Sequence, residues 1–207
     1  MLKILGKSSS INVRKVLWTC AEIGIPYDLE QWGAGMQPTN TGYFLALNPN
    51  GMVPVIQDDG ATLWESNTIC RYLAARHQRT DLLPAAPMAR AQVEKWIDWQ
   101  ATELNNSWRY AFMALVRQSA AHRDPAALAA GIADWNRNMR ILDAQLSTTN
   151  AYVNGATFTL ADIVLGLAVH RWMAAPIDHP QLTAVAAYYQ LLSDRAGFML
   201  HGRNGLP

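Results

Sequence analysis

The sequence predicts an α/β N-terminal domain followed by an all-α, helical C-terminal domain. Strand and helix patterns alternate over residues 1–77, a proline-containing segment at residues 78–87 interrupts them, and only helical periodicity follows in residues 88–207. The chain has 207 residues, half of them hydrophobic, which is enough to bury a full core in one large or two small domains. We therefore expect two domains joined by a linker at residues 78–87.

The first domain opens with a predicted βαβ unit. An apolar strand pattern at residues 2–5 is followed by hydrophobic residues at helical spacing, namely Val13, Val16, Leu17 and Cys20. Gly24 and Pro26 end this helix, and residues 27–31 have the pattern of a second strand. The polar, glycine-rich stretch at residues 33–43 is expected to run over the surface.

A hairpin and a helix complete the first domain. Residues 53–57 and 61–64 are predicted strands joined by a turn at residues 58–60, and residues 66–75 are predicted to be helical. This order of elements is economical for a thioredoxin-like module. The pattern alone also permits other small α/β folds.

Four helices are predicted in the second domain. The first spans residues 88–118 as one long helix, with a buried stripe formed by Ile97, Ala101, Leu104, Trp108, Ala111 and Leu115. The others cover residues 125–146, 160–173 and 182–193. The third is apolar on nearly all sides, so we expect it to form the centre of this domain.

The composition excludes several classes of partner. The chain carries 17 Lys and Arg against 16 Asp and Glu, with no basic block, which argues against nucleic acid or an anionic membrane as a partner. No run approaches the roughly 20 apolar residues of a membrane span, and no signal-peptide core follows Met1, so we expect a cytoplasmic protein that acts on a small molecule. Cys20 and Cys70 belong to no CxxC motif or Cys/His cluster, so we expect core thiols and neither a disulfide nor a metal site.

Residues 8–12, with the sequence SSSIN, lie at the predicted strand-to-helix turn. Hydroxyl groups at this place can cap the helix, and the free N–H groups together with the helix dipole favour an anion. Capping alone would explain one serine, so a purely structural role stays open for this segment.

Pro54, in the segment NPNGMVPVI, opens a predicted strand, where proline is tolerated. If the preceding bond is cis, the backbone N–H and C=O of Val53 face outward and can pair with an extended peptide-like ligand. A trans proline in a turn is the alternative interpretation.

Glu65 and Ser66 lie at the start of the next predicted helix. The Ser66 hydroxyl and the free N–H groups would bind a carboxylate, and Glu65 could pair with an ammonium group, although capping would also explain the pair. Taken together, the three segments predict a site for a dipolar tripeptide with an α-carboxylate, an α-amine and a central thiol.

With these segments in this order, the sequence resembles the cytosolic glutathione transferases, in particular bacterial serine-type members that are theta-like or phi-like. KSSSINVRKVL resembles the family's first turn with its activating hydroxyl, NPNGMVP its cis-proline loop, and ESNTICRYL its glutathione motif. FTLAD is similar to the family's capping box, in which Thr159 and Asp162 exchange hydrogen bonds and Phe158 and Ile163 form the hydrophobic staple. The resemblance covers essentially the whole chain and implies the family's two-domain fold.

The resemblance also implies roles for individual residues. Ser10 matches the hydroxyl that contacts the glutathione sulfur, Ser9 is the second choice, and Asn12 matches an Asn found in some bacterial relatives. The implied glutathione contacts are Met52, Val53, Pro54, Glu65 and Ser66, with Gln37, Thr39 and Asn40 as weaker matches. The Cys of the beta class and the Tyr of the mammalian classes are absent from the first turn, and Met52 stands where many relatives have Gln, which could weaken glutathione binding.

The function implied is a glutathione transferase that activates the glutathione thiol as a thiolate for attack on a small electrophile, by conjugation or halide displacement. Glutathione is the co-substrate, no metal is expected, and a homodimer is implied, with residues 65–75 and the helix from residue 88 in the interface. A non-catalytic glutathione-binding or scaffold protein and a glutathione-dependent disulfide reductase remain open as alternatives.

The pocket of the second substrate is expected on the long helix. Asn105, Arg109 and Met113 share one face of that helix. Similar bacterial transferases that accept small halogenated acids have an Arg in the place of Arg109, so the resemblance implies that Arg109 binds an acid group. A structural or inter-subunit salt bridge of Arg109 is the alternative.

Overall fold

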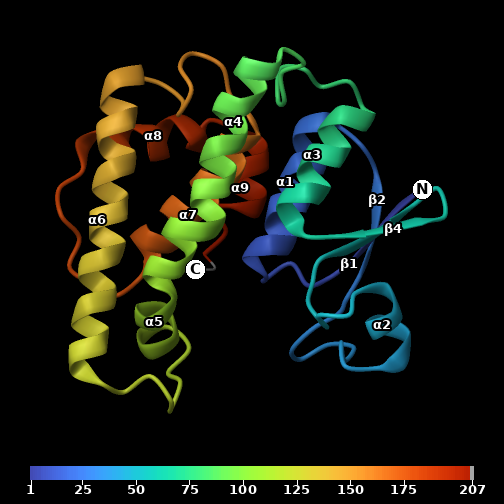
Figure 1. Ribbon diagram of the computed structural model, residues 1–207, viewed down its shortest axis with the longest axis horizontal. Coiled ribbons are helices and arrows are strands. Elements are labelled where there is room, and N and C mark those ends of the chain that lie inside the picture. Colours follow the sequence, from blue (N-terminus) through green and yellow to red (C-terminus); the bar gives the residue numbers. More distant parts are fainter. Residues whose placement is uncertain (206–207) are drawn as a thin grey trace.

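The computed structural model describes residues 1–205, in which an α/β domain and a helical domain lie side by side (Figure 1). The α/β domain contains, in order, β1 (Leu2–Leu5), α1 (Ile11–Ile23), β2 (Tyr27–Glu30), α2 (Gly42–Leu47), β3 (Val55–Asp58), β4 (Ala61–Trp64) and α3 (Ser66–Arg76). The strand order is β2-β1-β3-β4, with β1 parallel to β2 and β3 antiparallel to both β1 and β4. This order agrees with the thioredoxin-like arrangement.

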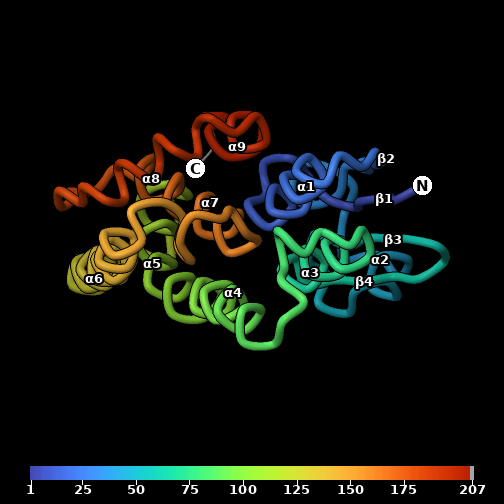
Figure 2. The backbone as a smooth tube through the Cα atoms, turned by 90° about the horizontal axis from the view of Figure 1, so that it is seen from above, coloured from blue at the N-terminus to red at the C-terminus, as the bar shows by residue number. Residues whose placement is uncertain are grey.

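The two faces of this sheet pack against different helices. Ile4 pairs with Ile56, and both belong to the main core with α1 and α3. Their neighbours Leu5 and Val55 point to the other face and form a smaller cluster with Phe44 of α2. Because side chains alternate along a strand, one pair of strands thus serves both cores. In Figure 2, α1 and α3 lie between the sheet and the helical domain.

The helical domain contains α4 (Pro87–Trp99), a π-helical turn η1 (Gln100–Leu104), α5 (Asn105–Leu115), α6 (Pro125–Thr149), α7 (Leu160–Ala174), α8 (Thr183–Ser193) and α9 (Ala196–His201). The four predicted helices are present, and the short helices α2 and α9 were not predicted. No helix within residues 1–205 combines the length and apolar character needed to cross a membrane.

The predicted long helix is interrupted by the π turn, and the prediction of a buried position is wrong for one residue of its stripe. Ala101 is exposed, whereas the neighbouring Gln100 is 2% exposed. A π turn holds an extra residue, so it rotates the faces of the helix relative to the expected phase. The helix also ends at Leu115 instead of near residue 118.

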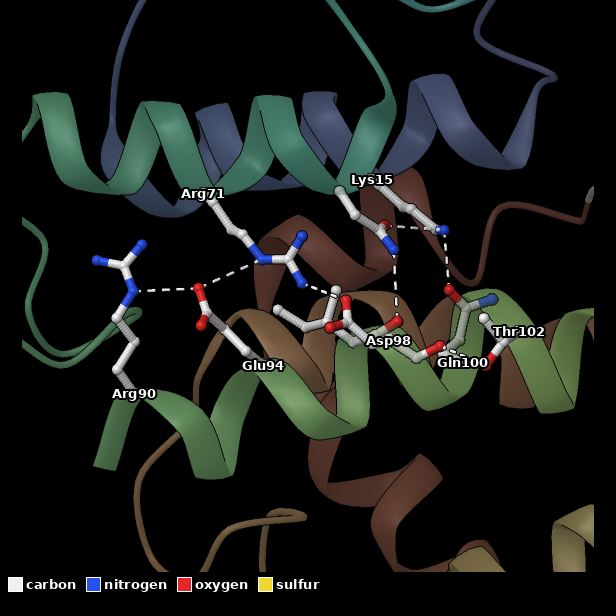
Figure 3. Close-up of polar contacts among 9 residues, drawn as sticks. Lys15, Arg71, Arg90, Glu94, Asp98, Gln100 and Thr102 are labelled. Atoms are coloured by element: carbon white, nitrogen blue, oxygen red, sulfur yellow. Dashed lines mark hydrogen bonds and ion pairs between the residues drawn. The ribbon is translucent and has the colours of Figure 1, made fainter. Parts of the chain in front are cut away.

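The rotation brings Gln100 against the α/β domain (Figure 3). The Lys15 Nζ of α1 donates to Gln100 Oε1 at 2.9 Å and to Asn67 Oδ1 of α3 at 3.1 Å. Burial lowers the pKa of this lysine to about 8, because both partners are neutral amides and the charged form is poorly solvated. In the same view, Arg71 of α3 pairs with Glu94 and Asp98 of α4. These polar contacts join the two domains.

Helix α7 lies at the centre of the helical domain, as expected, and every residue from Leu160 to Trp172 is buried. Its start has the predicted capping box, in which the Asp162 carboxylate accepts from the Thr159 backbone N–H at 2.9 Å. The same carboxylate also accepts from the Val153 N–H at 2.9 Å and the Tyr188 hydroxyl at 3.0 Å. Asp162 therefore connects the α6–α7 loop and α8 to the start of α7.

Candidate active site

The turn before α1 leaves the Ser10 hydroxyl free of helix capping. Ser10 is the N-cap residue, with an extended backbone (φ −80°, ψ 124°), and its side chain makes no capping hydrogen bond. Its backbone N–H donates to the Lys7 carbonyl at 3.0 Å, and its carbonyl accepts from the Arg14 N–H at 2.9 Å. The first N–H groups of a helix have no partner within the helix. The hydroxyl and the first-turn amides can therefore act together on an anion.

The loop before β3 is held by a buried asparagine that sequence reasoning did not single out. Asn48 is 3% exposed, its Nδ2 donates to the Met52 carbonyl at 2.8 Å, and its Oδ1 accepts from the Asn50 N–H at 3.0 Å. The Val53–Pro54 bond in this loop is cis. Asn48 therefore fixes the backbone on which Val53 is presented.

Glu65 connects β4 to α3 in a single residue, because β4 ends at Trp64 and α3 begins at Ser66. Its backbone is in the left-handed region, with φ 72°, which costs a non-glycine residue on the order of 1–3 kcal/mol. Such conformations concentrate at functional sites. The Glu65 side chain is exposed, and Ser66 behind it is buried in the first turn of α3.

These three segments surround two adjoining cavities. The smaller, of about 290 Å³, lies between Asn12, the loop at residues 48–54 and the Glu65–Ser66 pair. The larger, of about 660 Å³, opens between the α/β domain and helices α5 and α7. Asn12, Met52 and Val53 border both cavities, so an extended ligand in the smaller one would reach into the larger one beside Ser10.

The cavities gather most of the residues expected from the sequence. The larger cavity is bordered by Ser10, Asn12, Thr39, Met52, Val53, Arg109 and Met113. The smaller cavity is bordered by Asn12, Met52, Val53, Pro54, Glu65 and Ser66. Four expected residues border neither cavity, namely Ser9, Gln37, Asn40 and Asn105.

The larger cavity is strongly cationic. The residues that border it include one lysine and three arginines, namely Lys7, Arg109, Arg117 and Arg171, and no Asp or Glu within the described part of the chain. Lys7 Nζ donates to the Ala34 carbonyl at 2.9 Å. Sequence reasoning found only Arg109 of this group, because the cations come from three segments of the chain, before α1, at α5 and in α7, and form no motif.

Comparison with known proteins shows to which family the chain belongs. The family model described as the N-terminal domain of glutathione S-transferase matches residues 9–76, and the model of the C-terminal domain matches residues 125–191. The glutathione S-transferase GstB of Escherichia coli K12 is 34% identical over 197 residues, which cover 94% of both chains. The chain belongs to the cytosolic glutathione S-transferase family.

Other members of the family agree with this assignment. Glutathione S-transferase 3 of Zea mays is 35% identical, over 95% of this chain and 91% of its own. A theta-class glutathione S-transferase from Xanthomonas axonopodis pv. citri, solved with glutathione bound, superposes with a TM-score of 0.91 at 36% identity and covers 100% of this chain and 99% of its own. The predicted fold and the prediction of a glutathione transferase are confirmed, whereas the roles of individual residues remain predictions.

Proposed function

We propose that this transferase binds glutathione across the two cavities and activates its thiol as a thiolate through Ser10. The observation that carries the proposal is the Ser10 hydroxyl, which is not used for capping and borders the larger cavity, two residues before Asn12, which borders both cavities. The γ-glutamyl end would lie in the smaller cavity, with its carboxylate at Ser66 and its ammonium group at Glu65.

The required stabilisation is within reach of these groups. A thiol with a pKa near 8.5 is only a few per cent ionised at pH 7, and lowering the pKa by about two units requires about 2.7 kcal/mol of preference for the anion. One charge-assisted hydrogen bond contributes about 1.5–3 kcal/mol, and the dipole of α1 adds about 0.3–1 kcal/mol. The thiolate would then attack an electrophilic carbon, with addition or with departure of halide.

We also propose that the electrophile carries an acid group that Arg109 attracts. Arg109 is exposed, borders the larger cavity and forms no ion pair with any residue from 1 to 205. The absence of an intramolecular salt bridge disfavours the structural alternative. The test is Arg109→Ala, assayed in parallel on a haloacid and a neutral aryl halide. A loss confined to the acid supports the role, and an equal loss on both substrates refutes it.

A substrate panel distinguishes the proposed reaction from its alternatives. The wild-type protein is assayed with glutathione on haloacids, aryl halides, disulfides and peroxides, and glutathione binding is measured by calorimetry. Turnover of a halide supports the transferase. Exclusive turnover of disulfides would favour the reductase, and glutathione binding without any turnover would favour a non-catalytic binding protein.

We further propose a cytoplasmic homodimer, as the family resemblance implies. A two-fold interface needs a self-complementary surface, for which the candidates are α3 and α4. Arg71 is already paired within the chain with Glu94 and Asp98, so it links α3 to α4 and leaves neighbouring positions for the partner. A monomeric mass by light scattering at micromolar concentration would contradict the dimer.

A further inference from the structure

Arg171 is a buried arginine in the wall of the larger cavity. It lies in the last turn of α7 and borders the cavity, although only 4% of the residue is exposed. Asp162 is the only acid among the buried residues of α7, and it lies nine residues earlier, or about 13 Å along the helix axis at 1.5 Å per residue. The Asp162 carboxylate is engaged by Val153, Thr159 and Tyr188, so it does not neutralise Arg171.

Within residues 1–205, the Arg171 guanidinium lies against two aromatic rings and forms no salt bridge. Its Cζ lies 4.5 Å from the ring centroid of Trp108 and 4.3 Å from that of Phe112. Its Nε is buried without a hydrogen-bond partner in this part of the chain. Aromatic rings stabilise the positive charge, but they leave the N–H donors unpaired, and an unpaired buried donor is costly. A planar oxyanion satisfies such donors two at a time.

A second guanidinium contacts the same aromatic ring, Phe112. The Cζ of Arg117 lies 5.4 Å from the ring centroid of Phe112, and Arg117 also borders the larger cavity. The pKa of Arg171 is lowered to about 9, first by burial and then by the positive charges of Arg14 and Arg117. All of these influences disfavour the charged form, so a negative charge in the cavity that both arginines border would stabilise both of them.

We propose that Arg171 and Arg117 form an anion-binding subsite at the α7 wall of the larger cavity, which holds the carboxylate of an acidic electrophile. This inference rests on the proposed transferase function, and it assigns the specific contact to α7 instead of α5. Arg109 is exposed to water and is held by no ion pair within residues 1–205, so it attracts anions without fixing their position. Arg171 is held by Trp108 and Phe112, so its donors are already oriented.

The test compares two substrates that differ in charge and hardly in shape, a chloronitrobenzoate and the corresponding chloronitrobenzamide. The variant Arg171→Met keeps an apolar side chain of similar length against the two rings. The ratio of kcat/KM for the acid to kcat/KM for the amide is expected to fall at least about tenfold, as for loss of a charge-assisted hydrogen bond. Arg117→Met should lower the ratio less, because Arg117 is exposed. An unchanged ratio in Arg171→Met, with the loss confined to Arg109→Met, would overturn the proposal.

Two controls separate charge and folding from binding. Arg137→Met removes one positive charge from the exposed face of α6, outside the residues that line the cavity, and should leave the ratio unchanged. If Arg137→Met lowers the ratio as much as Arg171→Met, the effect is one of net charge and the subsite is refuted. Replacing a buried, unpaired charge with an apolar side chain is neutral or stabilising, so Arg171→Met should unfold at the same or a higher temperature than the wild type.

A binding measurement on the wild type keeps the test independent of turnover. With S-methylglutathione bound, the wild-type protein is titrated calorimetrically with unreactive nitrobenzoate and nitrobenzamide. The acid is expected to bind at least about tenfold more tightly. Equal affinities would refute the subsite even if Arg171→Met failed to fold. If no electrophile is turned over but the acid binds preferentially to the wild type and loses this preference in Arg171→Met, the proposed transferase chemistry fails and the subsite stands.

Discussion

Replacement of Ser10 by alanine should change the chemistry of bound glutathione without changing the stability of the protein. At an ordinary N-cap, loss of serine costs about 1 kcal/mol, because the side chain accepts a hydrogen bond from the helix. The Ser10 side chain makes no such bond, so we expect the free energy of unfolding to change by less than about 0.5 kcal/mol. A hydrogen bond to a thiolate contributes about 1.5–3 kcal/mol, which corresponds to an increase of about one to two units in the pKa of bound glutathione.

The assay is a pH titration of the ultraviolet thiolate absorbance in the enzyme–glutathione complex, together with a urea unfolding curve. Ser9→Ala is the matched control, because Ser9 borders neither cavity, and it should titrate as the wild type does. An unchanged pKa in Ser10→Ala would refute the assignment and leave the first-turn N–H groups of α1 or Asn12 as the activating groups. A fall of 1 kcal/mol or more in unfolding free energy at constant pKa would identify Ser10 as a cap, within the range of about 0.5–2 kcal/mol for such losses.

Glutathione binding, measured by calorimetry, should weaken about tenfold or more in Glu65→Gln and in Ser66→Ala, with little effect on the pKa of the bound thiol. Wild-type affinity in both variants would contradict the site. Thr68→Ala, on the exposed surface of α3, is the control. Burial lowers the pKa of Lys15 from 10.5 to about 8, so the unfolded chain binds more protons between these values and stability from this residue rises with pH. Between about pH 7 and pH 9 the unfolding free energy of the wild type should therefore rise by about 1 kcal/mol relative to Lys15→Met, and parallel pH profiles would disprove the shift. Asp162→Ala leaves several buried donors without an acceptor, so the free energy of unfolding in urea should fall by at least about 3 kcal/mol. The folded fraction should keep the kinetic constants of the wild type. A loss of kcat/KM without a loss of stability would show that Asp162 acts in catalysis and not in folding.

Local sequence patterns were sufficient for the order of elements and for the segments that we propose to bind glutathione. The strand at residues 2–5, the capping box at Asp162 and the serine turn before α1 all depend on neighbours a few residues away in the chain. Helix α2 was not predicted because it has only six residues and follows a glycine-rich loop. A segment this short does not show a recognisable helical periodicity.

Tertiary packing alone decided the phase of the long helix and the character of the larger cavity. Because of the π turn at residues 100–104, Gln100 and not Ala101 faces the junction between the domains, where its side chain accepts a hydrogen bond from Lys15 of the α/β domain. In the sequence, Arg171 is a single cation in an apolar helix, and nothing next to it in the chain indicates a binding role. Its burial against Trp108 and Phe112 arises only when α5 and α7 pack together, because the energy of a charge depends on the atoms that surround it in space and not on its neighbours in the chain.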